Sequence, residues 1–146
     1  MNMSKDDLNW FEVSSLDLDP QSVTEWVTSS STGATTLFVG TTRDHSEDRP
    51  GVIELEYEAY EEAVLVSFNE LSIAAREKWP DLERIAMLHR TGVVAVKGIA
   101  VIVAVSAAHR TNVFTACDFL IRELKKSSPI WKKETWSGGS AWVDHC

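Results

Sequence analysis

The chain has 146 residues, 44% of them hydrophobic, which is enough apolar material for one sizeable core in a single domain spanning residues 1–146. Its net charge of −8 argues against a general binder of nucleic acids or anionic membranes, because such proteins neutralise phosphates over a broad basic surface. Residues 1–10 are polar and no apolar run is long enough to span a bilayer, so we expect a cytosolic protein.

The first third of the chain is expected to contain a helix and a strand. Asp19 and Pro20 form the pattern of an N-cap followed by proline at the first helical position, and the helix is expected to end before Gly33. Residues 35–39 are β-branched and apolar, which predicts a strand, and the polar residues 44–51 predict a loop after it.

A second strand and a long helix are expected next. In residues 53–60, Ile53, Leu55 and Tyr57 alternate with glutamates, which is the period of a strand with one buried and one solvated face. Residues 61–79 carry apolar side chains at three- and four-residue intervals, so they predict an amphipathic helix that ends at the following proline.

The second half of the chain is expected to complete the sheet and add a helix. Residues 85–89 and 99–105 are apolar runs, and the second is β-branched as in a strand buried on both faces. Residues 110–126 predict an amphipathic helix that ends before Pro129, and residues 130–143 are strand-like around a Gly-Gly turn. This mixture of hairpin-like and crossover connections predicts an α+β, or mixed α/β, fold.

Basic residues are concentrated near the C-terminus of this acidic chain. Lys125, Lys126, Lys132 and Lys133 place four of the fourteen Lys and Arg residues within nine positions, which indicates a small anionic ligand. Further ionisable residues lie where predicted strands end, where a rigid scaffold can hold functional side chains: they are Arg43, His89 with Arg90, and His109 with Arg110.

Five short segments carry these residues in a specific order: FVGTTR (38–43), LEYEAY (55–60), HRTG (89–92), AHR (108–110) and PIWKKE (129–134). Together they resemble the large, catalytic subunit of molybdopterin synthase over about residues 34–134, and LEYEAY and PIWKKE are closer to eukaryotic members. The resemblance implies an α/β hammerhead-type fold with a mixed sheet and packed helices. It also implies a homodimer that binds two small ubiquitin-like subunits, which makes a heterotetramer.

The same resemblance implies the reaction. The enzyme would be a sulfurtransferase that moves sulfur from the C-terminal Gly-Gly thiocarboxylate of the small subunit to cyclic pyranopterin monophosphate. The product is the dithiolene of molybdopterin, in the biosynthesis of the molybdenum cofactor, and no metal or organic cofactor is needed for this step.

Motif matching to that family also assigns residues. Lys125 matches the lysine of the family's Leu-Lys pair beside the thiocarboxylate tail, and Lys132 matches the lysine after its Pro-x-Trp turn, so both are expected to be catalytic and to bind substrate. Further expected substrate-binding residues are Thr41, Thr42, Arg43, His109, Arg110, Lys133 and Glu134. Phe38 and Ile121 are expected to contact the partner's tail, and no metal site is expected.

Elementary electrostatics agrees with these roles. A thioacid tail and a phosphorylated pterin are both anionic, so fixed cations must offset their repulsion in a partly desolvated pocket. If Arg110 begins the helix that Lys125 ends, fifteen residues separate their backbones by roughly 22 Å. Because a pterin cannot bridge that distance, we expect a symmetric dimer in which each site takes residues from both subunits.

Other interpretations of these residues stay open. His89 lies in an apolar strand and is expected to be structural, Cys117 falls on the apolar face of a helix, and Cys146 has no evident activating neighbour beyond His145. An alternative function is a non-catalytic dimeric module that binds an acidic C-terminal tail through its lysines. A phosphate-substrate hydrolase with His109 as base ranks lower, because the sequence has no phosphate loop, nucleophile elbow or metal-ligand set.

Overall fold

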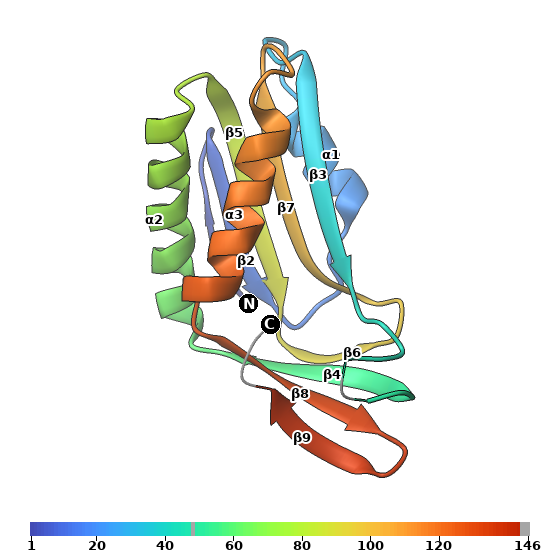
Figure 1. Cartoon of the computed structure of the whole chain (residues 1–146). Coiled ribbons are helices and arrows are strands. Elements are labelled where there is room, and N and C mark those ends of the chain that lie inside the picture. The colour runs from blue at the N-terminus through green and yellow to red at the C-terminus, as the bar shows by residue number, and fades with distance from the viewer. Residues whose placement is uncertain (48, 144–146) are drawn as a thin grey trace.

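The computed structural model describes residues 1–47 and 49–143 (Figure 1). Cys146 and His145, considered above, therefore lie outside the described residues. The elements, in chain order, are β1 (Asn2–Lys5), β2 (Asn9–Ser14), α1 (Pro20–Val27), β3 (Ala34–Thr41), β4 (Val52–Ala59), α2 (Glu61–Lys78), β5 (Leu82–Arg90), β6 (Gly92–Ala95), β7 (Ile99–Ala107), α3 (Val113–Ser127), β8 (Ile130–Trp136) and β9 (Gly139–Val143).

The larger sheet has the strand order β1-β2-β5-β7-β3. Strands β2 and β5 are parallel, whereas the other pairs are antiparallel. Helices α2 and α3 cover one face of this sheet and α1 covers the other (Figure 1). On β7, Val101 and Val103 join the core under α2 and α3, while Ile102 joins the core under α1. This double burial confirms the continuous apolar strand that the sequence predicts.

The smaller sheet has the order β6-β4-β8-β9, is antiparallel throughout, and lies across one end of the larger sheet (Figure 1). Its inner face presents Leu55, Tyr57 and Val94 to the main core. The C-terminal end of α3 and the end of β5 meet this inner face, so segments from distant parts of the sequence converge there. The predicted α+β class with a mixed sheet is confirmed, with the strands divided between two sheets.

Helix boundaries follow local signals. The side chain of Asp19 accepts a hydrogen bond from the backbone N–H of Gln21 at 3.0 Å, and Pro20 begins α1, which confirms the predicted N-cap. Helix α1 ends at Val27, well before Gly33. Helix α3 begins at Val113, three residues later than predicted, because the segment before it forms a turn.

The expected strands differ from the structure in two respects. No strand was expected at β1, β2 or β6, which are short or, in β1, polar and exposed. In β4 the predicted burial of Ile53 is wrong, since Ile53 is 51% exposed and Val52 is 4% exposed. A register shift between Val52 and Glu54 in the pairing with β8 turns Ile53 outward. Within the described residues, no helix is long and apolar enough to cross a membrane.

Candidate active site

A cavity of about 260 Å³ opens where the end of α3, the end of β5 and the loop after β3 face the smaller sheet. We call this cavity the junction pocket. Its cations come from three elements far apart in the sequence: Arg43 follows β3, Lys125 lies in the last turn of α3, and Lys132 lies in β8. Three positive side chains therefore share one pocket on a chain whose net charge is −8.

Helix α3 places Lys125 through its amphipathic spacing. Leu120, Ile121 and Leu124 are buried against the sheet, and Ile121 and Leu124 also line the pocket. Lys125 follows Leu124 in the last helical turn, where a positive charge is favoured by the helix dipole. The aliphatic wall beside an ammonium group suits a ligand that has both an anionic and an apolar part.

Strand alternation decides which residues of β8 face the pocket. Lys132 pairs with Tyr57 and Glu134 with Leu55 on the inner face of the small sheet, and all four line the pocket. Lys133 lies on the opposite face, where its Nζ is 3.9 Å from Glu56 Oε1. The predicted substrate-binding residue Lys133 is therefore not brought to this pocket.

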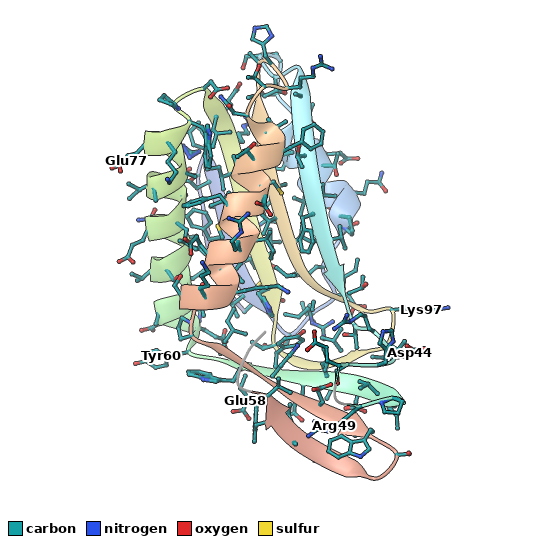
Figure 2. All side chains as sticks on the ribbon, in the orientation of Figure 1. Asp44, Arg49, Glu58, Tyr60, Glu77 and Lys97 are labelled. Atoms are coloured by element: carbon teal, nitrogen blue, oxygen red, sulfur yellow. The ribbon has the colours of Figure 1, made fainter. Side chains whose placement is uncertain are left out.

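Glu134 is engaged with the loop that follows β3. Its Oε1 lies 3.7 Å from Nη1 of Arg49, and the Glu134 residue is only 6% exposed. Figure 2 shows Arg49 and Asp44 beside the small sheet, and the loop residues His45 and Ser46 line the pocket. The ion pair holds the loop against β8 at the rim of the pocket.

His89 forms part of the pocket wall, which the sequence analysis did not predict. Its ring makes an edge contact with Tyr57 at a centroid distance of 4.9 Å, and Nδ1 lies 2.8 Å from the carbonyl oxygen of Arg90. Burial lowers the pKa of His89 to about 4, the hydrogen bond to Arg90 partly opposes this, and the charge of Lys125 lowers it further. The available signal was its position beside Arg90 at a strand end.

Of the remaining predicted site residues near this end of β3, one lines the pocket and two do not. Thr41 lines the pocket with Arg43, whereas the buried Thr42 has a hydroxyl with no hydrogen-bond partner in residues 1–47 and 49–143 and does not line it. Phe38 is half-buried against the main core, outside the pocket lining.

His109 and Arg110 lie at the other end of α3 from Lys125, and both are exposed. Between Val113 and Lys125, twelve residues of helix span about 18 Å. One chain therefore does not bring the His109 and Arg110 pair to the junction pocket. In the part of the chain that the structure describes, no cluster of His, Cys, Asp and Glu could hold a metal ion.

Comparison with known proteins agrees with this architecture. The family model described as MoaE protein matches residues 13–127. The molybdopterin synthase catalytic subunit 1 of Aedes aegypti is 40% identical over 141 residues, which cover 94% of this chain and 90% of that protein. The solved structure of molybdopterin synthase from Staphylococcus aureus has a TM-score of 0.87 and 30% identity, covering 97% of this chain and 100% of that one.

A second solved structure shares the fold. A complex of subunits 1 and 2 of molybdopterin-converting factor from Helicobacter pylori aligns with a TM-score of 0.75 at 20% identity, covering 92% of this chain and 90% of that one. The family model covers most of the chain, and the insect relative matches nearly its whole length. The chain therefore belongs to the MoaE family, the family of molybdopterin synthase catalytic subunits.

Proposed function

We propose that this chain is a sulfurtransferase, the catalytic subunit of a molybdopterin synthase. It takes sulfur from the C-terminal Gly-Gly thiocarboxylate of a small ubiquitin-like subunit and transfers it to cyclic pyranopterin monophosphate, forming the dithiolene. The observation that carries the proposal is the meeting of Arg43, Lys125 and Lys132 in one pocket of an acidic chain of this family. No metal or organic cofactor takes part in the proposed step.

The pocket cations have separate tasks in this proposal. Arg43 holds a substrate anion, because a guanidinium can bind phosphate through two parallel hydrogen bonds. Lys125 stabilises the negative charge that develops on the terminal carbonyl of the tail. Alternatively, its neutral amine attacks the carbonyl carbon, which breaks the C–S bond and releases the sulfur as hydrosulfide for transfer to the pterin. Lys132 assists proton transfer. The aliphatic side chain of Ile121, on the wall beside Lys125, suits contact with the inserted tail.

We also propose that the active site is shared between two copies of the chain. The length of α3 supports this, since about 18 Å of helix separates the backbones of Val113 and Lys125, and the exposed pair His109 and Arg110 precedes Val113. In a symmetric dimer, His109 and Arg110 of one subunit can approach the junction pocket of the other. Two small subunits then complete a heterotetramer.

The partner and the compartment belong to the same proposal. A complex of two subunits is known for the Helicobacter pylori protein that shares this fold, which supports a small-subunit partner here. A cytosolic location suits the free, buried thiol of Cys117, because reducing compartments keep thiols unpaired.

The deciding experiment is a reconstituted assay of dithiolene formation. Purified protein is mixed with thiocarboxylated small subunit and the pyranopterin, and the product is measured for wild type, Lys125→Ala and Lys126→Ala. Lys126 is the matched control, because it is the next residue on α3 and does not line the pocket. We expect Lys125→Ala to lose on the order of 10²-fold in rate and Lys126→Ala to stay close to wild type.

Two results would contradict the proposal. Undiminished product from a folded Lys125→Ala protein would remove Lys125 from the chemistry. Binding of the small subunit without any product in wild type would favour the non-catalytic module that binds an acidic tail.

A further inference from the structure

The buried histidine of the junction pocket has no task in the proposed reaction. His89 is 4% exposed, lies at the end of β5, and lines the pocket together with Lys125 and Lys132. Burial of an ionisable ring beside cations has a cost unless the ring stays neutral and its polar atoms are used. The inference that follows rests on the proposed function.

The hydrogen bond at Nδ1 determines the tautomer of this ring. A backbone carbonyl can only accept, so the 2.8 Å contact with the oxygen of Arg90 requires Nδ1 to carry the hydrogen and donate it. Nε2 then bears the lone pair and is a hydrogen-bond acceptor. Since the pKa of His89 is lowered to about 4, the ring keeps this neutral form at physiological pH.

Only some of the charged groups around the pocket can donate a hydrogen bond to Nε2. Glu134 is an acceptor and is paired with Arg49, and the neighbouring loop residue His45 is paired with Asp44. The donors are Arg43, Lys125 and Lys132. Lys125 lines the same pocket as His89, and its charge contributes to the lowered pKa of the His89 ring.

We propose that His89 is a positioning residue for Lys125: its Nε2 accepts a hydrogen bond from the Lys125 ammonium and holds that group at the inner wall of the pocket. Lysine has a flexible four-carbon stem, and Lys125 is exposed, so an unrestrained ammonium would spend much of its time in solvent. A neutral acceptor orients the ammonium and leaves its charge available to the anionic tail. A carboxylate at this position would cancel that charge.

Two substitutions separate this role from a purely structural one. His89→Gln places an amide oxygen, an acceptor, close to the position of Nε2. His89→Asn keeps an amide donor close to the position of Nδ1 but is too short to place an acceptor at the position of Nε2. We expect His89→Gln to retain kcat within a few-fold and His89→Asn to lose about 10- to 100-fold in kcat, with KM for the small subunit little changed. Thermal unfolding of both variants checks that they are folded.

The opposite ranking would overturn the proposal. If His89→Asn is active and His89→Gln is not, the bond to Arg90 is what matters and the role is structural. If both variants keep full activity, His89 positions nothing. These outcomes leave the activities of wild type and Lys125→Ala unchanged, so they are distinguishable from failure of the proposed function.

A double-mutant cycle identifies the lysine that His89 holds. The effect of His89→Asn on kcat should vanish in a Lys125→Met background and persist in a Lys132→Met background, because coupled residues are non-additive and independent ones are additive. Coupling to Lys132 in place of Lys125 would contradict the assignment.

A readout without turnover tests the same contact if no product is formed. Acylation of individual lysines by a soluble N-hydroxysuccinimide ester is followed by peptide mass spectrometry. Lys125 should react several-fold faster in His89→Asn than in wild type or His89→Gln, while Lys126 reacts equally in all three. Equal rates at Lys125 in the three proteins would refute the contact.

Discussion

Oε1 of Glu134 and Nη1 of Arg49 lie 3.7 Å apart, and this ion pair joins strand β8 to the loop between β3 and β4. The guanidinium of Arg49 also lies over the ring of Trp136, 4.1 Å from its centroid. The side chain of Glu134 is 7% exposed and that of Arg49 is 31% exposed. A carboxylate that lines the junction pocket is therefore held by Arg49, a residue that no sequence pattern singled out.

Loss of Arg49 should destabilise the protein. Arg49→Met leaves the buried carboxylate of Glu134 without its cation, and we expect the free energy of unfolding to fall by about 1–3 kcal/mol in urea titrations. The control is Arg122→Met, which breaks the exposed pair with Asp118 and should cost less than about 1 kcal/mol. If Glu134→Gln does not reduce the cost of Arg49→Met, the two side chains are not coupled.

Stability should depend on the titration of His89. Its pKa falls from 6.5 to about 4 on folding, so between these values the unfolded chain binds a proton that the native protein does not. Above pH 6.5 the titration of His89 does not reduce the free energy of unfolding. As the pH falls below 6.5 this free energy decreases, and the loss reaches about 3 kcal/mol near pH 4. Urea unfolding at several pH values should show a steeper loss for wild type than for the non-titrating His89→Gln. Parallel curves would contradict the lowered pKa.

Cys117 should be unreactive in the folded protein. Its thiol donates to the carbonyl oxygen of Val103 at 3.6 Å, and burial raises its pKa to about 11. In a Cys146→Ser background, which removes the other thiol of the chain, iodoacetamide at pH 8 should modify Cys117 only in denaturant. Rapid modification of Cys117 in the native protein would show that the reagent reaches the buried face of α3.

Gly33 should tolerate no side chain. A Cβ atom at this position would lie 2.4 Å from the backbone oxygen of Ala108, just before His109. Gly33→Ala should cost about 1–3 kcal/mol in unfolding free energy and displace the segment that carries His109 and Arg110. Ser30→Ala, at an exposed position in the same turn, is the control, and equal stability of the two variants would contradict this clash.

Mixed dimers should recover activity if the active site is shared. Arg110→Ala and Lys125→Ala proteins should each be nearly inactive in dithiolene formation. After random exchange of subunits in an equal mixture, half of the dimers contain one of each chain and have one intact site, so about a quarter of wild-type activity should return. No recovery after proven exchange would mean that Arg110 and Lys125 act within one subunit.

Local periodicity made much of the fold predictable. Helices α2 and α3 and strands β5 and β7 carry long apolar patterns, and these patterns depend only on residues close in the sequence. Strand β1 has no such pattern, because it is a short, exposed edge strand that exists through its pairing with β2. The outward turn of Ile53 depends on register with β8, some eighty residues later along the chain.

The sequence by itself determined the composition of the candidate site: a lysine pair at a helix end, a further lysine pair after a Pro-x-Trp turn, arginines at strand ends, and a family pattern that joins them. Tertiary structure decided which of these residues meet. It brought Lys132 and Glu134 to the pocket and turned Lys133 away, because alternate residues of a strand face opposite sides of its sheet. It also brought His89 to the wall of the pocket that Lys125 lines, since burial and contact are properties of packed elements and cannot be read from neighbours in the chain.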